Sequence, residues 1–323
     1  MLATFTVTNN TDGPVAAAGD LTGSLRQAIF DANAAPGDNT IEFAPSVFTG
    51  GDASLIRLMA GELEITDTLS IADAVENEVT IDAQENSRVL NFTASTGDLS
   101  LDGITITGGL TTGDTVDSTI NSFNGGGIRF LSDGTLTLTN STVTENGTLG
   151  ERADGGGIFT DSGSVALTNS AVSQNSTSGS FASGGGVHSS SGSISVNGSV
   201  VSQNSTSGFR ADGGGIYSSS GYVRLTNSSV SANSTTGERS EGGGISTFSG
   251  SITLLDSEVS RNSTAGYAAD GGGIFSSLGL VILTNSEVIG NSTSGDNATG
   301  GGIHHNRGDV TLLNSTVLSL IHI

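Results

Sequence analysis

The chain has 323 residues, but 49 glycines, three prolines, no tryptophan and 5% aromatic residues do not describe an ordinary globular core. Asp and Glu total 32 against 10 basic residues, all of them arginine, and the formal net charge of −22 excludes a nucleic-acid-binding surface and favours an extracellular setting. Cysteine is absent, which excludes disulfides, thiolate metal sites and cysteine nucleophiles.

Residues 1–10 lack the basic and apolar regions of a signal peptide. No run of apolar residues approaches the ~18 that a membrane span needs. We therefore expect no membrane insertion by this segment. Either export is signalled elsewhere or the sequence is an excerpt of a longer protein.

Residues 1–110 form one predicted region, an N-terminal cap followed by irregular coils. Ser24 begins the segment SLRQAIFDANA, and Ser24 with Gln27 three residues later predicts a capping box ahead of a short amphipathic α-helix. We assign this helix as the polar cap that a solenoid needs over its first coil. Strand-like segments flank it at 3–8, 39–43, 63–71, 79–82 and 99–107.

Residues 111–317 form a second predicted region, which is built from a regular repeat. The triplet GGG begins at positions 125, 155, 184, 213, 242, 271 and 300, so the first spacing is thirty residues and the next five are each twenty-nine. The one extra residue lies just before Gly134. A unit reads GGGI, four variable residues, Gly, three alternating apolar positions, Asn-Ser, Val-Ser-x-Asn-Ser-Thr and a variable loop.

Four aliphatic columns, headed by Ile128, Leu136, Leu138 and Val143, recur through the units. The second and third columns lie two residues apart, the spacing of side chains on one face of a strand. Each unit thus has about three short strands, which can bury their apolar faces only by stacking on neighbouring units. The sequence predicts an all-β fold, a single-stranded right-handed parallel β-helix (β-solenoid), because connections between parallel strands are overwhelmingly right-handed.

A polar column stands three residues after the fourth apolar column. Stacked amides can hydrogen-bond from coil to coil and satisfy the backbone of a turn, so we interpret this column as a structural ladder. The Asn-Ser-Thr triplets also match the glycosylation sequon, but the ladder explains their regular recurrence better. The column comprises Asn146, Asn175, Asn204, Asn233, Asn262 and Asn291.

Residues 318–323 break the pattern, since Leu-Ser-Leu-Ile-His-Ile stands where Ser-x-Asn-Ser-Thr is due. An open apolar edge invites strand addition. We expect this tail to mark a truncation or foreign sequence.

The motifs resemble those of bacterial surface proteins of the parallel β-helix class. Residues 23–33, GSLRQAIFDAN, are similar to an N-terminal segment of large secreted β-helix proteins, and GGGI at 213–216 with VSAN at 230–233 resembles the GGA-I and F-x-x-N motifs of chlamydial-type polymorphic outer-membrane proteins, with Val in place of Phe. The resemblance implies an adhesin or autotransporter-like passenger at the bacterial cell surface. Its partner would be a host or neighbouring-cell surface, or a polysaccharide.

The position after the first apolar column should point outward, and planar side chains are frequent there. Spaced at the coil rise, they would form a flat stripe for sugar rings or a protein partner. Alternatively, they stack on each other or lie beneath the variable loop. The candidate stripe comprises Phe159, His188, Tyr217, Phe275 and His304.

A second candidate site lies just before the GGG triplets, where carboxylates recur in successive units. Glu241 and Asp270 are the closest pair, and carboxylates one coil apart can share a Ca²⁺ ion. The alternative is a local ion pair, because Arg152, Arg210 and Arg239 each stand two residues before an acid. We predict no other cofactor.

No catalytic residue can be assigned from the sequence. A carbohydrate-active enzyme of the polysaccharide lyase or glycoside hydrolase type, or a remnant of one, is the alternative to an adhesive or structural protein, but catalysis needs a single asymmetric cluster and these acids mostly recur in columns. The sequence indicates no Ser/His/Asp arrangement and leaves the oligomeric state open.

Overall fold

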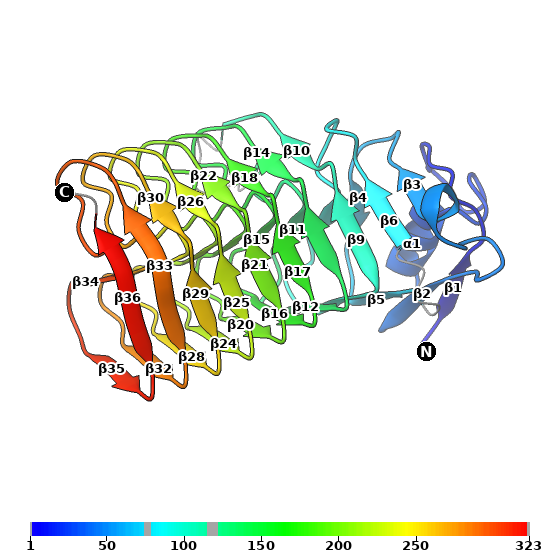
Figure 1. Ribbon diagram of the computed structural model, residues 1–323. Coiled ribbons are helices and arrows are strands. Elements are labelled where there is room, and N and C mark those ends of the chain that lie inside the picture. Colours follow the sequence, from blue (N-terminus) through cyan, green and yellow to red (C-terminus); the bar gives the residue numbers. More distant parts are fainter. Residues whose placement is uncertain (1, 74–78, 115–121, 322–323) are drawn as a thin grey trace.

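The computed structural model describes residues 2–73, 79–114 and 122–321. Over these ranges the chain winds as a stack of short strands, and the sheets are all parallel (Figure 1). The predicted all-β parallel β-solenoid is therefore confirmed. Its right-handed winding stays a prediction.

Sheet 1 contains nine strands and carries the first apolar column. Its strands are β4 (Leu63–Ile65), β7 (Leu90–Phe92), β11 (Ile128–Phe130), β15 (Ile158–Thr160), β19 (Val187–Ser189), β23 (Ile216–Ser218), β27 (Ile245–Thr247), β31 (Ile274–Ser276) and β34 (Ile303–His305).

Sheet 2 contains eleven strands and carries the second and third apolar columns. Its strands are β1 (Thr4–Val7), β2 (Asn39–Phe43), β5 (Leu69–Ala72), β8 (Leu99–Asp102), β12 (Thr135–Thr139), β16 (Ser164–Thr168), β20 (Ile194–Asn197), β24 (Val223–Thr226), β28 (Ile252–Leu255), β32 (Val281–Thr284) and β35 (Val310–Leu313).

Sheet 3 contains sixteen strands in two strips, which the long strand β33 joins. The strip that carries the fourth apolar column comprises β3 (Leu55–Arg57), β6 (Val79–Asp82), β9 (Ile104–Thr107), β13 (Thr142–Thr144), β17 (Ala171–Ser173), β21 (Val200–Ser202), β25 (Ser229–Ser231), β29 (Glu258–Ser260), β33 (Glu287–Thr293) and β36 (Thr316–Ile321). The other strip comprises β10 (Leu110–Thr111), β14 (Gly147–Thr148), β18 (Ser176–Thr177), β22 (Ser205–Thr206), β26 (Ser234–Thr235) and β30 (Ser263–Thr264). A full repeat therefore has four strands rather than the expected three, because the Ser-Thr pair after the ladder asparagine forms a two-residue strand of its own.

The register of the strands reproduces the sequence repeat. Ile128 pairs with Ile158, thirty residues on, whereas Leu136 pairs with Val165, twenty-nine residues on. The extra residue therefore lies between β11 and β12, as the spacing of the triplets indicated. The loop between these strands absorbs it without shifting any later pair.

The four aliphatic columns meet in one continuous core. From residue 128 to Val288 every member is at most 1% exposed. Val310, Leu312 and Val317 belong to the last described coil and are 42%, 48% and 37% exposed, because only one side of this coil packs against another described coil. Each coil thus buries its apolar face against its neighbours, as a solenoid requires.

The described part of the predicted N-terminal region, 1–110, belongs to the same three sheets as the repeats. The segment predicted as one strand at 63–71 turns a corner and supplies β4 to sheet 1 and β5 to sheet 2, and the segment 99–107 similarly divides into β8 and β9. The strands β3, β7 and β10 and a short 3₁₀ helix, η1 (Gly51–Ser54), were not predicted. Their sequences are too short and irregular to show a period.

The predicted helix is present as α1 (Leu25–Ala34), which packs against β1, β2 and β4 at one end of the stack (Figure 1). The N–H of Gln27 donates to Oγ of Ser24 at 3.1 Å, which is half of the predicted capping box. The other half is absent, because Oε1 of Gln27 accepts from the N–H of Leu21 instead. The role of α1 as a cap stays a prediction.

The glycine triplets form a corner where neighbouring backbones come very close. Gly213 has a φ of +66°, a conformation that favours glycine. A Cβ on Gly214 would lie 2.4 Å from the carbonyl oxygen of Ser234 and 2.5 Å from that of Gly243. No side chain fits there, which explains why the triplet recurs in every full unit.

The described part of the pattern-breaking tail continues the stack. β36 pairs in parallel with β33, with a register shift between Ile289 and Ser292. Residues 322 and 323 of the predicted tail lie outside the described residues. Strand pairing therefore extends past the end of the sequence repeat.

Candidate binding groove and neighbouring sites

The asparagine column forms a hydrogen-bonded ladder inside the corner after the fourth apolar column. Nδ2 of Asn204 donates to the carbonyl of Val172 and to Oδ1 of Asn233, both at 2.9 Å. Oδ1 of Asn204 accepts from the backbone N–H and from Nδ2 of Asn175, both at 3.0 Å. The same pattern links Asn146, Asn175, Asn204, Asn233, Asn262 and Asn291, and all six are buried.

We call the five residues of the candidate stripe the planar column. Their side chains do not form the expected outward stripe. Phe159, His188 and Phe275 are only 1%, 6% and 4% exposed, so the expectation that they face solvent is wrong. Tyr217 and His304 are half-buried. The rings instead stack from coil to coil, with centroids 5.2 Å apart for Phe159 and His188 and 5.0 Å apart for His188 and Tyr217.

The acids before the triplets explain part of this burial, because they lie against the planar column of the next coil. Oδ1 of Asp154 is 3.6 Å from Nδ1 of His188, and Oδ2 of Asp270 is 3.9 Å from Nδ1 of His304. Oδ1 of Asp154 also accepts from the backbone N–H of Ser183 at 2.7 Å. Each of these aspartates therefore connects its coil to the next.

Burial is the main cause of the shifted pKa values of Asp154 and His188. Loss of solvent raises the pKa of Asp154 to about 8, against the opposing hydrogen bond from Ser183 and the positive charge of Arg152. Loss of solvent also lowers the pKa of His188 to about 4. At neutral pH both groups are uncharged.

His188 lies between a carboxyl group and a hydroxyl, because Oγ of Ser190 is 3.4 Å from its Nε2. The sequence did not reveal this Asp154, His188, Ser190 arrangement. A signal was available, since both histidines of the planar column follow an aspartate at the same distance along the chain, one repeat plus five positions. The N–H groups of Ser190 and Ser191 donate to backbone carbonyls of the preceding coil at 3.0 and 2.8 Å, which occupies the donors that an oxyanion hole would need.

The predicted ion pairs of the loop arginines with their own acids do not form. Among the described residues, no contact within 4.0 Å joins Arg210 to Asp212 or Arg239 to Glu241. Arg152 approaches Glu151 instead, at 4.0 Å. Oδ1 of Asp212 accepts from the N–H of Glu241 on the next coil at 2.7 Å, and the positive charge of Arg210 lowers the pKa of Asp212 without a direct contact.

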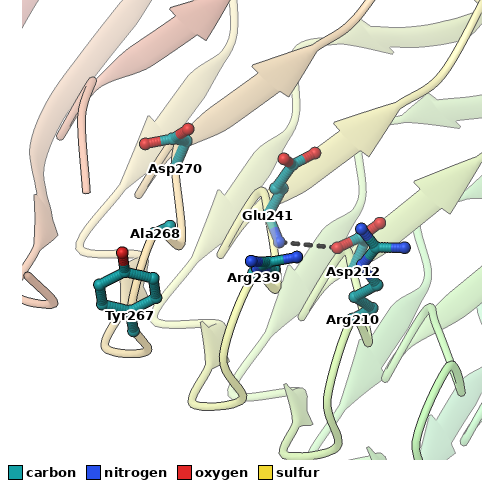
Figure 2. Close-up of a pocket in the computed structure, with 7 residues that line it drawn as sticks. All are labelled: Arg210, Asp212, Arg239, Glu241, Tyr267, Ala268 and Asp270. Carbon is teal, nitrogen blue, oxygen red and sulfur yellow. Dashed lines mark hydrogen bonds between the residues drawn. The ribbon is translucent and has the colours of Figure 1, made fainter. Parts of the chain in front are cut away.

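These side chains border a groove of about 550 Å³ that crosses three successive coils (Figure 2). In Figure 2 the carboxyl groups of Asp212, Glu241 and Asp270 follow one another from coil to coil, with Arg210, Arg239 and Tyr267 in the loops beside them. The lining residues are Arg210, Asp212, Arg239, Glu241, Tyr267, Ala268 and Asp270.

The charge of the groove depends on pH. Burial, together with the carboxylates of Asp212 and Asp270 on either side, raises the pKa of Glu241 to about 8, against the opposing charge of Arg210. Burial likewise raises the pKa of Asp212 to about 6. At neutral pH Glu241 is therefore protonated and can donate a hydrogen bond.

Glu241 and Asp270, the candidate calcium pair, both line this groove. Among the residues that the structure describes, no group of three or more His, Asp or Glu side chains is arranged to hold a metal ion. Calcium binding by this pair stays a prediction.

An irregular polar cluster lies on sheet 1 near the first repeats. Nη1 of Arg88 is 2.5 Å from Oε2 of Glu62, and Oε1 of Glu62 accepts from Nδ2 of Asn91 at 2.7 Å. Nε of Arg129 donates to Oδ1 of Asn91 at 2.9 Å. Burial lowers the pKa of Arg88 to about 10. The charges satisfy one another, so this cluster joins the irregular coils to the regular ones.

Next to the groove, the variable loops carry exposed aromatic and arginine side chains. Phe181 and Phe209 are 37% and 38% exposed, and their ring centroids are 5.6 Å apart in an edge-to-face contact. The guanidinium of Arg152 lies 5.2 Å from the Phe181 ring, and that of Arg210 lies 5.7 Å from the Phe209 ring. With Tyr267, which is 47% exposed, these residues form what we call the loop surface. Sequence reasoning missed it because the loop positions vary from unit to unit.

Fold and groove together define a parallel β-solenoid with a polar groove beside exposed aromatic loops. No helix in the described ranges is long and apolar enough to span a membrane. Comparison of the chain with protein-family models, with curated proteins and with solved structures finds no match.

Proposed function

We propose that this chain is an adhesive and structural rod at a bacterial cell surface or outside the cell, and that its loop surface binds carbohydrate. The resemblance to passenger domains of polymorphic outer-membrane proteins supports the setting. One observation supports the binding role most strongly. Phe181, Phe209 and Tyr267 are exposed on neighbouring loops next to the groove, whereas the candidate stripe is largely buried.

The chemistry of this region suits a sugar. Aromatic rings stack on the apolar faces of sugar rings, and a small number of polar groups beside them fix the orientation of the ligand. The groove offers guanidinium donors from Arg210 and Arg239 and carboxyl groups from three coils. A polyhydroxylated ligand needs both donors and acceptors of this kind.

The test compares two sets of exposed aromatic residues. The variant Phe181→Ser/Phe209→Ser/Tyr267→Ser should lose binding to a glycan array and to cells. The control Tyr222→Ser/Phe248→Ser alters two aromatic residues that are each 56% exposed and do not line the groove, and it should bind as the unmodified protein does. Equal binding by both variants would refute a role for the loop surface.

A carbohydrate-active enzyme is the second candidate, and the protonation of Glu241 favours it. A glycoside hydrolase needs one carboxylic acid that is protonated at neutral pH and a second carboxylate nearby. Glu241, with its pKa of about 8, has the first property, and it lies between Asp212 and Asp270. Release of reducing ends from a polysaccharide panel, abolished by Glu241→Gln, would support hydrolysis. Intact polysaccharides after prolonged incubation would rule it out for that panel.

A further inference from the structure

The two arginines of the groove have no hydrogen-bonding partner in the part of the chain that the structure describes. The guanidinium groups of Arg210 and Arg239 take part in no hydrogen bond or ion pair with another side chain or carbonyl there. Arg26 and Arg88, by contrast, contact Asp12 and Glu62 at 2.7 and 2.5 Å. Arg210 and Arg239 thus keep their donors available for a ligand.

Their spacing suits a single small anion. The two residues occupy the same position in successive loops, and parallel strands lie about 4.8 Å apart. Both have a left-handed backbone, with φ values of 52° and 55°, so the two loops turn in the same way. Two planar guanidinium groups one coil apart can hold one carboxylate between them.

The surrounding charges restrict what kind of anion fits. Asp212 and Asp270 also line the groove, and the chain as a whole carries a net charge of −22. A polyanion would meet this acidic surface along its whole length, whereas a ligand with one carboxylate would place a single negative charge beside the two arginines. Glu241 is protonated at neutral pH and adds a donor rather than a charge.

We propose that Arg210 and Arg239 bind the carboxylate of a sugar acid at the end of an otherwise neutral glycan. This inference rests on the proposed carbohydrate-binding function and names its ligand class. The sugar ring lies against Tyr267, which lines the same groove and is 47% exposed. The hydroxyl groups of the sugar reach the carboxyl groups that line the groove.

The test uses matched oligosaccharides that differ only in a terminal N-acetylneuraminic acid. We expect the unmodified protein to bind the acidic member more tightly, and Arg210→Gln/Arg239→Gln to weaken that binding by about tenfold or more, since hydrogen bonds to charged groups are involved. The neutral member should lose less affinity than the acidic one, because its hydroxyl groups form only hydrogen bonds to uncharged acceptors with the two arginines. Arg224→Gln, an exposed arginine on sheet 2, is the control and should leave both affinities unchanged.

Three other outcomes overturn the inference in different ways. If both oligosaccharides bind equally and the double variant binds as well, the sugar acid is wrong but the loop surface still binds carbohydrate. If polyglutamate competes as strongly as the acidic glycan, the arginines recognise an acidic peptide instead. If neither oligosaccharide binds and the loop-surface variant also keeps its cell binding, the proposed function fails too.

Discussion

Replacement of one ladder asparagine should destabilise the solenoid locally. The variant Asn204→Ala removes two hydrogen bonds that Nδ2 donates, to Val172 and Asn233, and two that Oδ1 accepts from Asn175. The backbone N–H of Asn204 keeps its own bond to Asn233 at 2.9 Å. The change therefore leaves the backbone N–H of Asn175 without its acceptor and takes one donor from the carbonyl of Val172.

The expected loss follows from burial. Asn175 and Asn204 are 0% and 1% exposed, so water cannot replace the missing partners. A buried polar group without a partner costs about 1–3 kcal/mol, and the N–H of Asn175 is such a group, so we expect a loss of about 1–3 kcal/mol. Because each coil contacts mainly its neighbours, the loss should be concentrated in the coils on either side.

Two measurements check this prediction. Urea unfolding followed by circular dichroism should show a lower midpoint for Asn204→Ala, and hydrogen exchange at the amide of Asn175 should become faster. The control is Asn197→Ala, which alters an exposed asparagine whose side chain makes no hydrogen bond in the described part of the chain, and it should cost less than about 0.5 kcal/mol. If the two variants unfold at the same urea concentration, the ladder does not stabilise the fold as argued.

The corner glycine and the Asp154–His188 pair give three more predictions. Gly214→Ala should lower the melting temperature severely, because the new Cβ would meet two backbone carbonyls. The control Gly147→Ser should be tolerated, because the paired position on the next coil is already serine. Equal melting temperatures for the two variants would contradict this prediction. Between pH 4 and 6.5 the folded chain holds one proton more than the unfolded chain at Asp154, with its pKa of about 8, and one fewer at His188, with its pKa of about 4, so the two effects of this pair cancel. From pH 6.5 to 8 Asp154 is the member of the pair that lowers stability, while Glu241 and Asp212, with pKa values of about 8 and 6, add a similar pH dependence to the unmodified protein and to both variants. Compared with the unmodified protein, Asp154→Asn should therefore lose less stability as pH rises above 6.5, and it should become less stable as pH falls from 6.5 to 4. His188→Phe places a phenylalanine next to Phe159 in the stack, and this variant should lose stability continuously as pH rises from 4 to 8. If the melting temperatures of the unmodified protein and of the two variants depend on pH in the same way, Asp154 and His188 are not a buried, uncharged pair.

Much of the fold was predictable because it depends on a short period. A core that repeats with every unit allows only neighbouring units to contact each other, so the positions of Ile128 and Leu136 in one unit predict their partners in the next. The helix start at Ser24 was predictable for a similar reason, since capping is a contact over three residues. The division of 63–71 between two sheets was not, because the early units share no common length.

The candidate site depended on the path of the loops. The sequence placed the planar column outside the core, but only the folded chain shows that Asp154 lies against His188, and that Asp212 accepts a hydrogen bond from the backbone of the next coil. The sequence by itself determined which residues stack, because the strand period and the repeat length are local properties of the chain. Which side chains are exposed at the groove was decided by the tertiary structure, since it depends on how each variable loop folds over the coil beneath it.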